Sequence, residues 1–254
     1  MYAELQSISP SRGIVSTVAA PASEPLSDIE FGLVQQYCAR TMAEILRLGL
    51  SVHIEQDFDA FAQARRSVGD GFCYPTFDPA RCRISASDFW LRVVDDGGKT
   101  VSTLATRIFE DVEDFYQLIR SEAIWGDRIL RAVGRCHPVC TIPPFGGVIA
   151  HNGGMWVDPT RRGHGLAKLL HGLSRGLALR NSAIDHDTGL VFEPLVRVAF
   201  SQYQFPRCDL VIDGYFPPTG KPERVYLCHI SRAEALASMA LAAVDNREPL
   251  SAVA

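Results

Sequence analysis

The chain has 254 residues, of which 47% are hydrophobic and 21% are charged, and its formal net charge is −4. This composition is ordinary for a globular protein with a substantial core, and it lacks the basic run that nucleic-acid binding needs. No apolar run is long enough to span a bilayer, so we expect neither a nucleic acid nor a membrane as a partner.

The first predicted helix follows an irregular leader. Residues 1–26 are rich in Ser, Pro and Ala, show no periodicity, and lack the basic start and continuous apolar core of a secretory signal. Ser27 and Glu30 form a capping-box pattern, after which apolar residues recur at helical spacing until Gly49 ends the helix. We therefore expect a leader over 1–26 and an added N-terminal helix over 27–49.

A strand, a short helix and a long loop are predicted next. Residues 50–54 alternate like a half-buried strand, and Asp57 is placed to cap a helix that ends near Arg66. The segment 69–87 is predicted to be a loop, whose aromatic residues either cover a pocket or fix the loop to the core. These residues are Phe72, Tyr74 and Phe77.

A β-hairpin and a second short helix follow. Residues 89–94 and 100–109 have strand composition and flank Asp95-Asp96-Gly97-Gly98, which is typical of a hairpin turn. Asp111 predicts the start of a helix with Phe115 on its apolar face.

The segment 147–157 predicts a strand with Gly153 and Gly154 in its interior. Glycine inside a strand indicates a bulge or the close approach of a ligand to the backbone. A glycine-containing turn follows, and then leucines at helical spacing predict an amphipathic helix over 165–180. These leucines are Leu166, Leu169, Leu170, Leu173 and Leu177. The polar residues Lys168, His171, Arg175 and Arg180 are expected to lie largely off this apolar stripe.

The C-terminal third predicts a short strand, a helical segment, two further strands and a final alanine-rich helix. The expected ranges are 189–192, 195–204, 208–215, 224–230 and 232–244.

The cysteines predict reduced thiols in a cytoplasmic protein. There are seven, an odd number, and they are scattered along the chain rather than spaced like a disulfide framework. The segment Cys136-His137-Pro138-Val139-Cys140 is their one cluster, and no second Cys/His pair lies at a convincing spacing for zinc. We therefore predict no metal site.

The turn over 162–167 has the features of an anion-binding site. It contains Gly163 and Gly165, carries no acidic side chain, and leads directly into the predicted helix. The first amides of a helix have no partner within the helix, and glycines let an anion approach them closely. An ordinary strand–turn–helix connection, in which the glycines only relieve strain, is the alternative interpretation.

Arg162, Gly165 and Ala167, after a strand ending in Val-x-Pro, resemble the acyl-coenzyme A signature of the GNAT (Gcn5-related) N-acetyltransferase superfamily. The same spacing occurs at 66–71, but that copy holds an aspartate within the turn and is not followed by a helix pattern. The resemblance in element order covers roughly residues 50–230. It implies an α/β (α+β) fold with a mixed, mostly antiparallel central sheet flanked by helices, and leaves 231–254 as a C-terminal helix and tail.

The resemblance implies acetyl-CoA as co-substrate. In that case the backbone amides of residues 163–168 hold the pyrophosphate, the strand at 155–157 pairs with the pantetheine arm, and a backbone N–H at the bulge polarises the thioester carbonyl. The implied cofactor-binding residues are Met155, Trp156, Val157, Arg162, Gly163, His164, Gly165, Leu166, Ala167 and Lys168.

The catalytic candidates are one acid and two bases. In the family, a tyrosine donates a proton to the departing thiolate, and Tyr203 lies 41 residues after Arg162, although Gln204 stands where a glycine is usual. An ammonium group must lose a proton before it can attack, and His151 and Glu193 are the candidate bases by position.

Two functions remain open at this level. The first is an acyl-CoA-dependent N-acetyltransferase in which a primary amine, on a small molecule or a protein, attacks the thioester directly. The second is a non-catalytic GNAT-like module that binds acyl-CoA as a sensor. An unrelated nucleotide-binding domain is disfavoured because the chain lacks a Gly-Lys-Ser/Thr loop and a G-x-G-x-x-G after its first strand. A homodimer is compatible with the sequence.

Overall fold

The computed structural model describes residues 24–69, 71–126, 142–216 and 218–245. Within these residues, seven strands form one sheet. They are β1 (Leu50–Glu55), β2 (Phe89–Asp95), β3 (Thr100–Val112), β4 (Gly147–Val157), β5 (His186–Phe192), β6 (Arg207–Phe216) and β7 (Lys221–Ser231). The strand order is β1-β2-β3-β4-β5-β7-β6, and β4 and β5 form the single parallel pair in the described sheet. The predicted fold class, a mixed and mostly antiparallel sheet flanked by helices, is confirmed.

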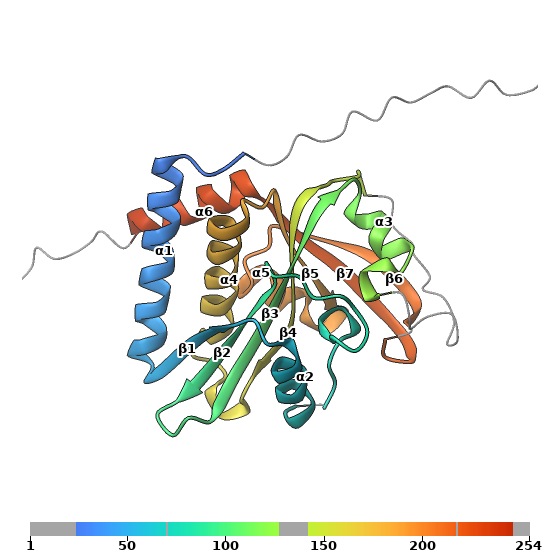
Figure 1. Cartoon of the computed structure of the whole chain (residues 1–254), viewed down its shortest axis with the longest axis horizontal. Coiled ribbons are helices and arrows are strands. Elements are labelled where there is room, and N and C mark those ends of the chain that lie inside the picture. The colour runs from blue at the N-terminus through green and yellow to red at the C-terminus, as the bar shows by residue number, and fades with distance from the viewer. Residues whose placement is uncertain (1–23, 70, 127–141, 217, 246–254) are drawn as a thin grey trace, which may run out of the picture.

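Helices cover both faces of this sheet (Figure 1). They are α1 (Asp28–Arg47), α2 (Phe58–Ser67), α3 (Phe115–Arg120), α4 (Leu166–Ser182), α5 (Val196–Ser201) and α6 (Arg232–Asp245). Short 3-10 turns lie at Pro75–Phe77, Ala123–Trp125, Pro159–Arg161 and Glu193–Leu195. Alternation along the strands separates the layers, since Leu91 packs into the core shared with α1, α4 and α6, whereas the adjacent Trp90 packs against α2.

The N-terminal helix is packed directly on the helix that follows the glycine turn. The capping box of Ser27 and Glu30 forms as predicted. Gly176 of α4 lets α1 approach closely, because a Cβ at this position would lie 2.5 Å from the Sγ of Cys38. Packing against α1 therefore buries the face of α4 that points away from the sheet.

Two local predictions were wrong. Asp111 does not cap α3, which instead begins after Asp114, whose side chain accepts a hydrogen bond from the amide of Tyr116. Strand β3 continues through Asp111, which adopts a positive φ of 52° near the strand's end. The other error concerns α4, because His171 and Arg175, expected off the apolar stripe, are both buried.

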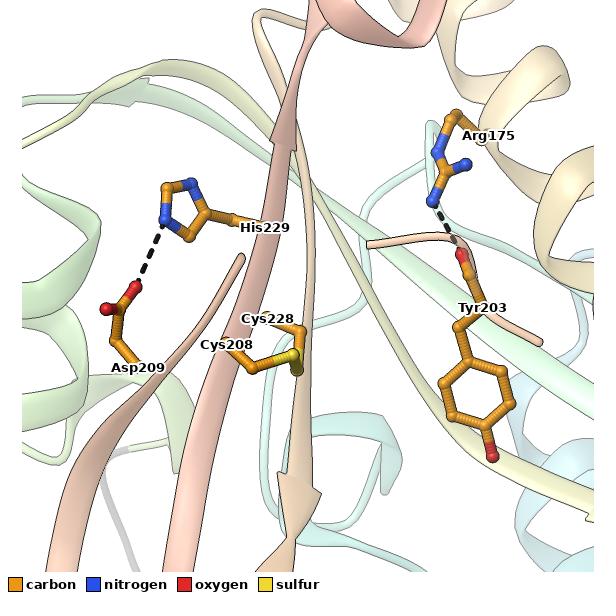
Figure 2. Close-up of a disulfide and its surroundings, with 6 residues drawn as sticks. All are labelled: Arg175, Tyr203, Cys208, Asp209, Cys228 and His229. Atoms are coloured by element: carbon orange, nitrogen blue, oxygen red, sulfur yellow. Dashed lines mark hydrogen bonds and ion pairs between the residues drawn. A yellow bond between two sulfur atoms is a disulfide. The ribbon is translucent and has the colours of Figure 1, made fainter. Parts of the chain in front are cut away.

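The prediction that all cysteines are reduced was also wrong. Cys208 and Cys228 face each other in the register of β6 and β7 and form a disulfide (Figure 2). Cys38, Cys73 and Cys82 are free thiols, and the Cys136–Cys140 cluster lies outside the described residues. Among the helices described, none has the length and apolar character to cross a membrane.

Candidate active site

Strands β4 and β5 separate at the centre of the sheet. Their parallel pairing runs from Ile149 opposite His186 to Asn152 opposite Gly189, and no pair is formed beyond that point in the described sheet. Just past it, β4 bulges at Gly154, which has a φ of 61° and whose carbonyl accepts a hydrogen bond from Thr103 Oγ1 at 3.0 Å. The edge of β4 that faces β5 is thus without a strand partner from the bulge onward.

A cavity of about 260 Å³ occupies this gap. His171, Tyr203 and Phe205 line it from the side of α4, and the strands contribute Gly153, Gly154, Met155, Leu190 and Val191. A group of aromatic residues lines it from the opposite face of the sheet, where α2 and α3 pack. The cavity therefore passes through the sheet and gives access to the β4 edge from both faces.

Tyr203, the predicted proton donor, lines this cavity. The residue is 8% exposed, and its ring stacks on that of His171 with the centroids 4.0 Å apart. Its hydroxyl forms no hydrogen bond to any described residue, and burial raises the pKa of the phenol. The structure thus places a phenol hydroxyl that is protonated at neutral pH in this cavity, and its role as proton donor stays a prediction.

A buried ion pair fixes the backbone of Tyr203. Arg175 Nε lies 2.6 Å from Asp187 Oδ2, and Arg175 Nη2 donates to the Tyr203 carbonyl oxygen at 3.0 Å. The amide of Asn152 donates to the other carboxylate oxygen of Asp187. Figure 2 shows the Tyr203 ring pointing away from the guanidinium that holds its carbonyl. The network connects β4, β5 and α4 to Tyr203, the second residue after α5.

Sequence reasoning missed this arginine. Arg175 stands off the leucine stripe of α4, a position that normally indicates solvent. A signal was present in its small neighbours, Ser174 and Gly176, because small residues on a helix indicate close packing of another element on that side.

His151 lines the cavity as a neutral imidazole. Thr188 Oγ1 donates its one proton to the Ala150 carbonyl at 2.9 Å, so His151 Nδ1 must be the donor in its 3.0 Å contact with that hydroxyl. The Nε2 atom then carries the lone pair, and it has no partner among the described residues. Burial, with a smaller effect from Arg107, lowers the pKa of His151 to about 3. At neutral pH this ring is a hydrogen-bond acceptor and a weak base.

Glu193 is placed outside the cavity. It is exposed, forms an ion pair with Arg224, and lies 3.4 Å from the hydroxyl of Tyr226. Of the three catalytic candidates, the structure therefore brings Tyr203 and His151 together and leaves Glu193 at the surface.

His171 is a lining residue that the sequence did not suggest. It is buried, and neither ring nitrogen has a hydrogen-bond partner within the described part of the chain. Burial, with a smaller effect from Arg175, lowers its pKa to about 3. Its stacking on Tyr203 fixes one face of the phenol ring.

The glycine turn forms an open cradle at the start of α4. Gly165 is the N-cap, with a φ of 74° and no side-chain cap, and the first turn carries no acid. A Cβ on Gly163 or Gly165 would meet no atom within 4 Å, so the space over these amides is open. Arg162 donates from Nε to the Val157 carbonyl at 3.1 Å, which ties the turn to the end of β4.

The other predicted cofactor residues lie along the same path. Met155 lines the cavity, and Trp156 and Val157 continue β4 toward the turn. His164 and Lys168 are exposed at the cradle. Uncapped amides, an unpaired strand edge and a phenol without a partner among the described residues thus follow one another along this path.

No family model matches the chain, and no curated protein sequence matches it. Among solved structures, it is similar to Arabidopsis thaliana NAA60 in complex with acetyl-CoA, with 13% identity, 72% of this chain and 99% of that chain covered, and a TM-score of 0.45. It is also similar to a spermidine N-acetyltransferase from Vibrio cholerae in complex with CoA and spermine, with 10% identity and a TM-score of 0.43. This match covers 74% of this chain and 98% of that chain.

A third similar structure is the ribosomal-protein-S18-alanine N-acetyltransferase from Escherichia coli, with 13% identity and a TM-score of 0.42. This match covers 72% of this chain and 93% of that chain. These similarities are distant. The fold class rests on the chain's own topology, a mostly antiparallel sheet in which the parallel strands β4 and β5 are joined by the helix that begins at the glycine turn.

Proposed function

We propose that this chain is an acyl-CoA-dependent N-acetyltransferase that transfers an acetyl group from acetyl-CoA to a primary amine by direct attack. One observation carries the proposal: the gap between β4 and β5 holds a cavity in which the unpaired Tyr203 hydroxyl shares the space with the Gly154 bulge. The uncapped start of α4 lies at the end of the same strand.

The chain's own residues would hold the co-substrate at three places. The amides from Gly163 to Lys168 would bind the pyrophosphate, and the free edge of β4 from Met155 to Val157 would pair with the pantetheine arm. When bound, acetyl-CoA supplies an activated acyl group. A backbone N–H at the bulge would donate to the carbonyl oxygen as negative charge develops there.

The reaction is balanced with Tyr203 as the acid. A bond forms between the amine nitrogen and the acyl carbon, the carbon–sulfur bond breaks, and the Tyr203 hydroxyl gives its proton to the departing sulfur. The proton that the attacking nitrogen loses then returns to the Tyr203 phenolate through water, so the protein ends in its starting state. The amine nitrogen must be neutral to attack. Because the pKa of His151 is lowered to about 3, this imidazole accepts a hydrogen bond from the amine rather than removing a proton from an ammonium group. The amine therefore enters in its neutral form or loses its proton to water.

A second candidate function is a non-catalytic sensor of acyl-CoA. It is favoured by one observation, which is that no carboxylate lines the cavity among the described residues. A base for the incoming ammonium group is then missing from the protein itself.

Release of free thiol from acetyl-CoA, measured across a panel of primary amines, tests the proposal. We expect turnover with at least one amine and its loss in Tyr203→Phe, with coenzyme A binding retained. Tight binding of acetyl-CoA, by calorimetry, without thiol release for any amine would instead support the sensor.

A further inference from the structure

We propose that the acceptor is a small monoamine that binds in its neutral form and carries an aromatic or branched apolar group, and that polyamines are rejected. The inference rests on the proposed acetyltransferase function and specifies its acceptor. It is carried by the half of the cavity that lies on the face of α2 and α3, which we call the aromatic chamber. The chamber is formed by Tyr74, Phe77, Trp125, Phe192 and Phe216.

Four of the five chamber rings form a continuous aromatic wall. Phe216 packs edge-on against both Trp125 and Phe192, with ring centroids 5.4 Å and 5.9 Å apart, and Phe192 packs against Tyr74 at 6.0 Å. Phe77, Trp125 and Phe216 are each at most 2% exposed. Such a surface gains most from a ligand ring or a branched apolar group, which contacts the side chains without needing hydrogen bonds.

No counter-charge for an ammonium group is available there. Arg65 is the single formally charged side chain among the described lining residues, and it is a cation. Three buried carboxylates outside the lining are already paired, Asp187 with Arg175, Asp88 with Arg107, and Asp78 with Arg66. Because these carboxylates are occupied by arginines, a second or third ammonium group of a polyamine would be buried without a partner.

One directional contact for a neutral amine is present. His151 stacks on Phe77, with centroids 5.9 Å apart, and its Nε2 lone pair has no partner among the described residues. An amine N–H can donate to this atom, whereas an acyl chain offers it nothing. This contact favours the amine, rather than a long acyl group, as the occupant of the chamber.

The size of the cavity limits the acceptor further. Its volume of about 260 Å³ lies just below the usual range for small-molecule pockets, roughly 300–1,000 Å³. Part of that space, beside Gly154 and Tyr203, belongs to the reacting acyl group, so the remaining chamber suits one ring or one short branched chain.

The first test compares 2-phenylethylamine with 1,5-diaminopentane as acceptors. We expect kcat/KM for the aromatic amine to be higher by at least about tenfold, because the diamine has a second ammonium group that must also be deprotonated or buried without a partner. Calorimetry with 2-phenylethylamine alone adds a readout that needs no turnover, and binding should be lost in Trp125→Ala.

The second test installs a carboxylate at the mouth of the chamber. Leu195 lines the cavity and is 42% exposed, so Leu195→Glu should fold, and it should shift the kcat/KM ratio toward the diamine by several fold. The matched control is Leu241→Glu on α6, which adds the same charge at a position that is 68% exposed and outside the cavity, and should leave the ratio unchanged.

The outcomes separate the two proposals. The acceptor class is overturned, while the acetyltransferase function stands, if the diamine is turned over as well as or better than the aromatic amine. The same holds if thiol release becomes faster only with longer acyl-CoA donors. Selective binding of 2-phenylethylamine without thiol release supports the chamber assignment and overturns the function. If 2-phenylethylamine shows no binding and no turnover, the chamber assignment is overturned.

Discussion

Arg175 donates a hydrogen bond from Nη2 to the main-chain carbonyl oxygen of Tyr203 at 3.0 Å, across 28 residues of sequence. The same guanidinium is held by Asp187 at 2.6 Å, and both charged side chains are nearly inaccessible to solvent. The position of the proposed acid therefore depends on an ion pair between α4 and β5, which are the elements on either side of the candidate site.

Arg175→Lys should lower kcat by about tenfold or more while changing KM for acetyl-CoA little. Lysine keeps the charge beside Asp187 but lacks the planar fork that reaches the carboxylate and the carbonyl together. Steady-state kinetics, with the KM for acetyl-CoA measured separately, checks this split. Arg175→Met should in addition cost about 3–5 kcal/mol of stability, because it leaves Asp187 buried and uncompensated.

The double variant Arg175→Met with Asp187→Leu distinguishes positioning from stability. Removing both charges should restore most of the free energy of unfolding without restoring kcat. Recovery of kcat in this variant would show that the pair serves only the fold.

Tyr203→Phe should lower kcat by about 10²–10⁴-fold and leave coenzyme A affinity unchanged, since only the proton donor is lost. The phenylalanine ring can keep the stacking on His171, so the fold should be retained. Because burial raises the pKa of Tyr203, the protonated, active form persists to higher pH than for an ordinary tyrosine. The alkaline limb of the kcat profile should accordingly lie above the usual tyrosine range in wild type. If the alkaline fall in kcat persists in Tyr203→Phe, a group other than Tyr203 causes it.

Gly165→Glu should abolish coenzyme A binding, because it places a carboxylate over the open amides that start α4. Calorimetry with coenzyme A measures the affinity. Gly98→Glu is the matched control, since Gly98 has a φ of 78° and equally open surroundings in the β2–β3 turn, so the two variants carry a similar backbone penalty of about 1 kcal/mol. Equal coenzyme A affinities in the two variants would show that the pyrophosphate does not bind at this turn.

Acid should destabilise the fold through two histidines. His151 and His171 are buried in neutral form, and burial lowers the pKa of each from 6.5 to about 3. A depressed pKa means that the unfolded chain binds the proton first, so the stability present above pH 6.5 is lost as pH falls toward 3. Each histidine contributes a slope of up to about 1.4 kcal/mol per pH unit in this range.

His171→Phe tests this dependence. The phenylalanine keeps a ring against Tyr203 and cannot titrate, so the fall in the free energy of unfolding between pH 6.5 and 4 should be shallower than in wild type. Denaturant unfolding at several pH values measures the slope. A slope identical to that of wild type would mean that His171 takes up its proton in the folded state as readily as in the unfolded chain.

Periodicity along single elements explains how much of the fold could be predicted. The capping box at Ser27, the strand over 147–157 and the helix after Gly165 all carry their signals within one segment, and all three form. Asp111 was misplaced because an aspartate signals a helix start equally well at several nearby positions, and the strand ladder extended past it.

The candidate site was predictable only where a motif existed. The resemblance singled out Tyr203, which lines the cavity in the structure. Partners from distant segments, such as Asp187 for Arg175, leave no local pattern in the sequence. Glu193 followed a strand as a catalytic carboxylate would, yet its ion pair with Arg224 of β7 depends on a strand order that the sequence does not display.

Reduction of the Cys208–Cys228 disulfide should destabilise the chain by about 2–4 kcal/mol, because the bond closes a loop spanning 20 residues of sequence in the unfolded state. Thermal unfolding with and without a thiol reductant measures this loss, and Cys208→Ser should unfold at the lower temperature in both conditions. The matched control is Cys82→Ser, which removes a free thiol and should keep the full response to reductant. A wild-type melting temperature that does not respond to reductant would show that this pair of thiols is not joined in solution.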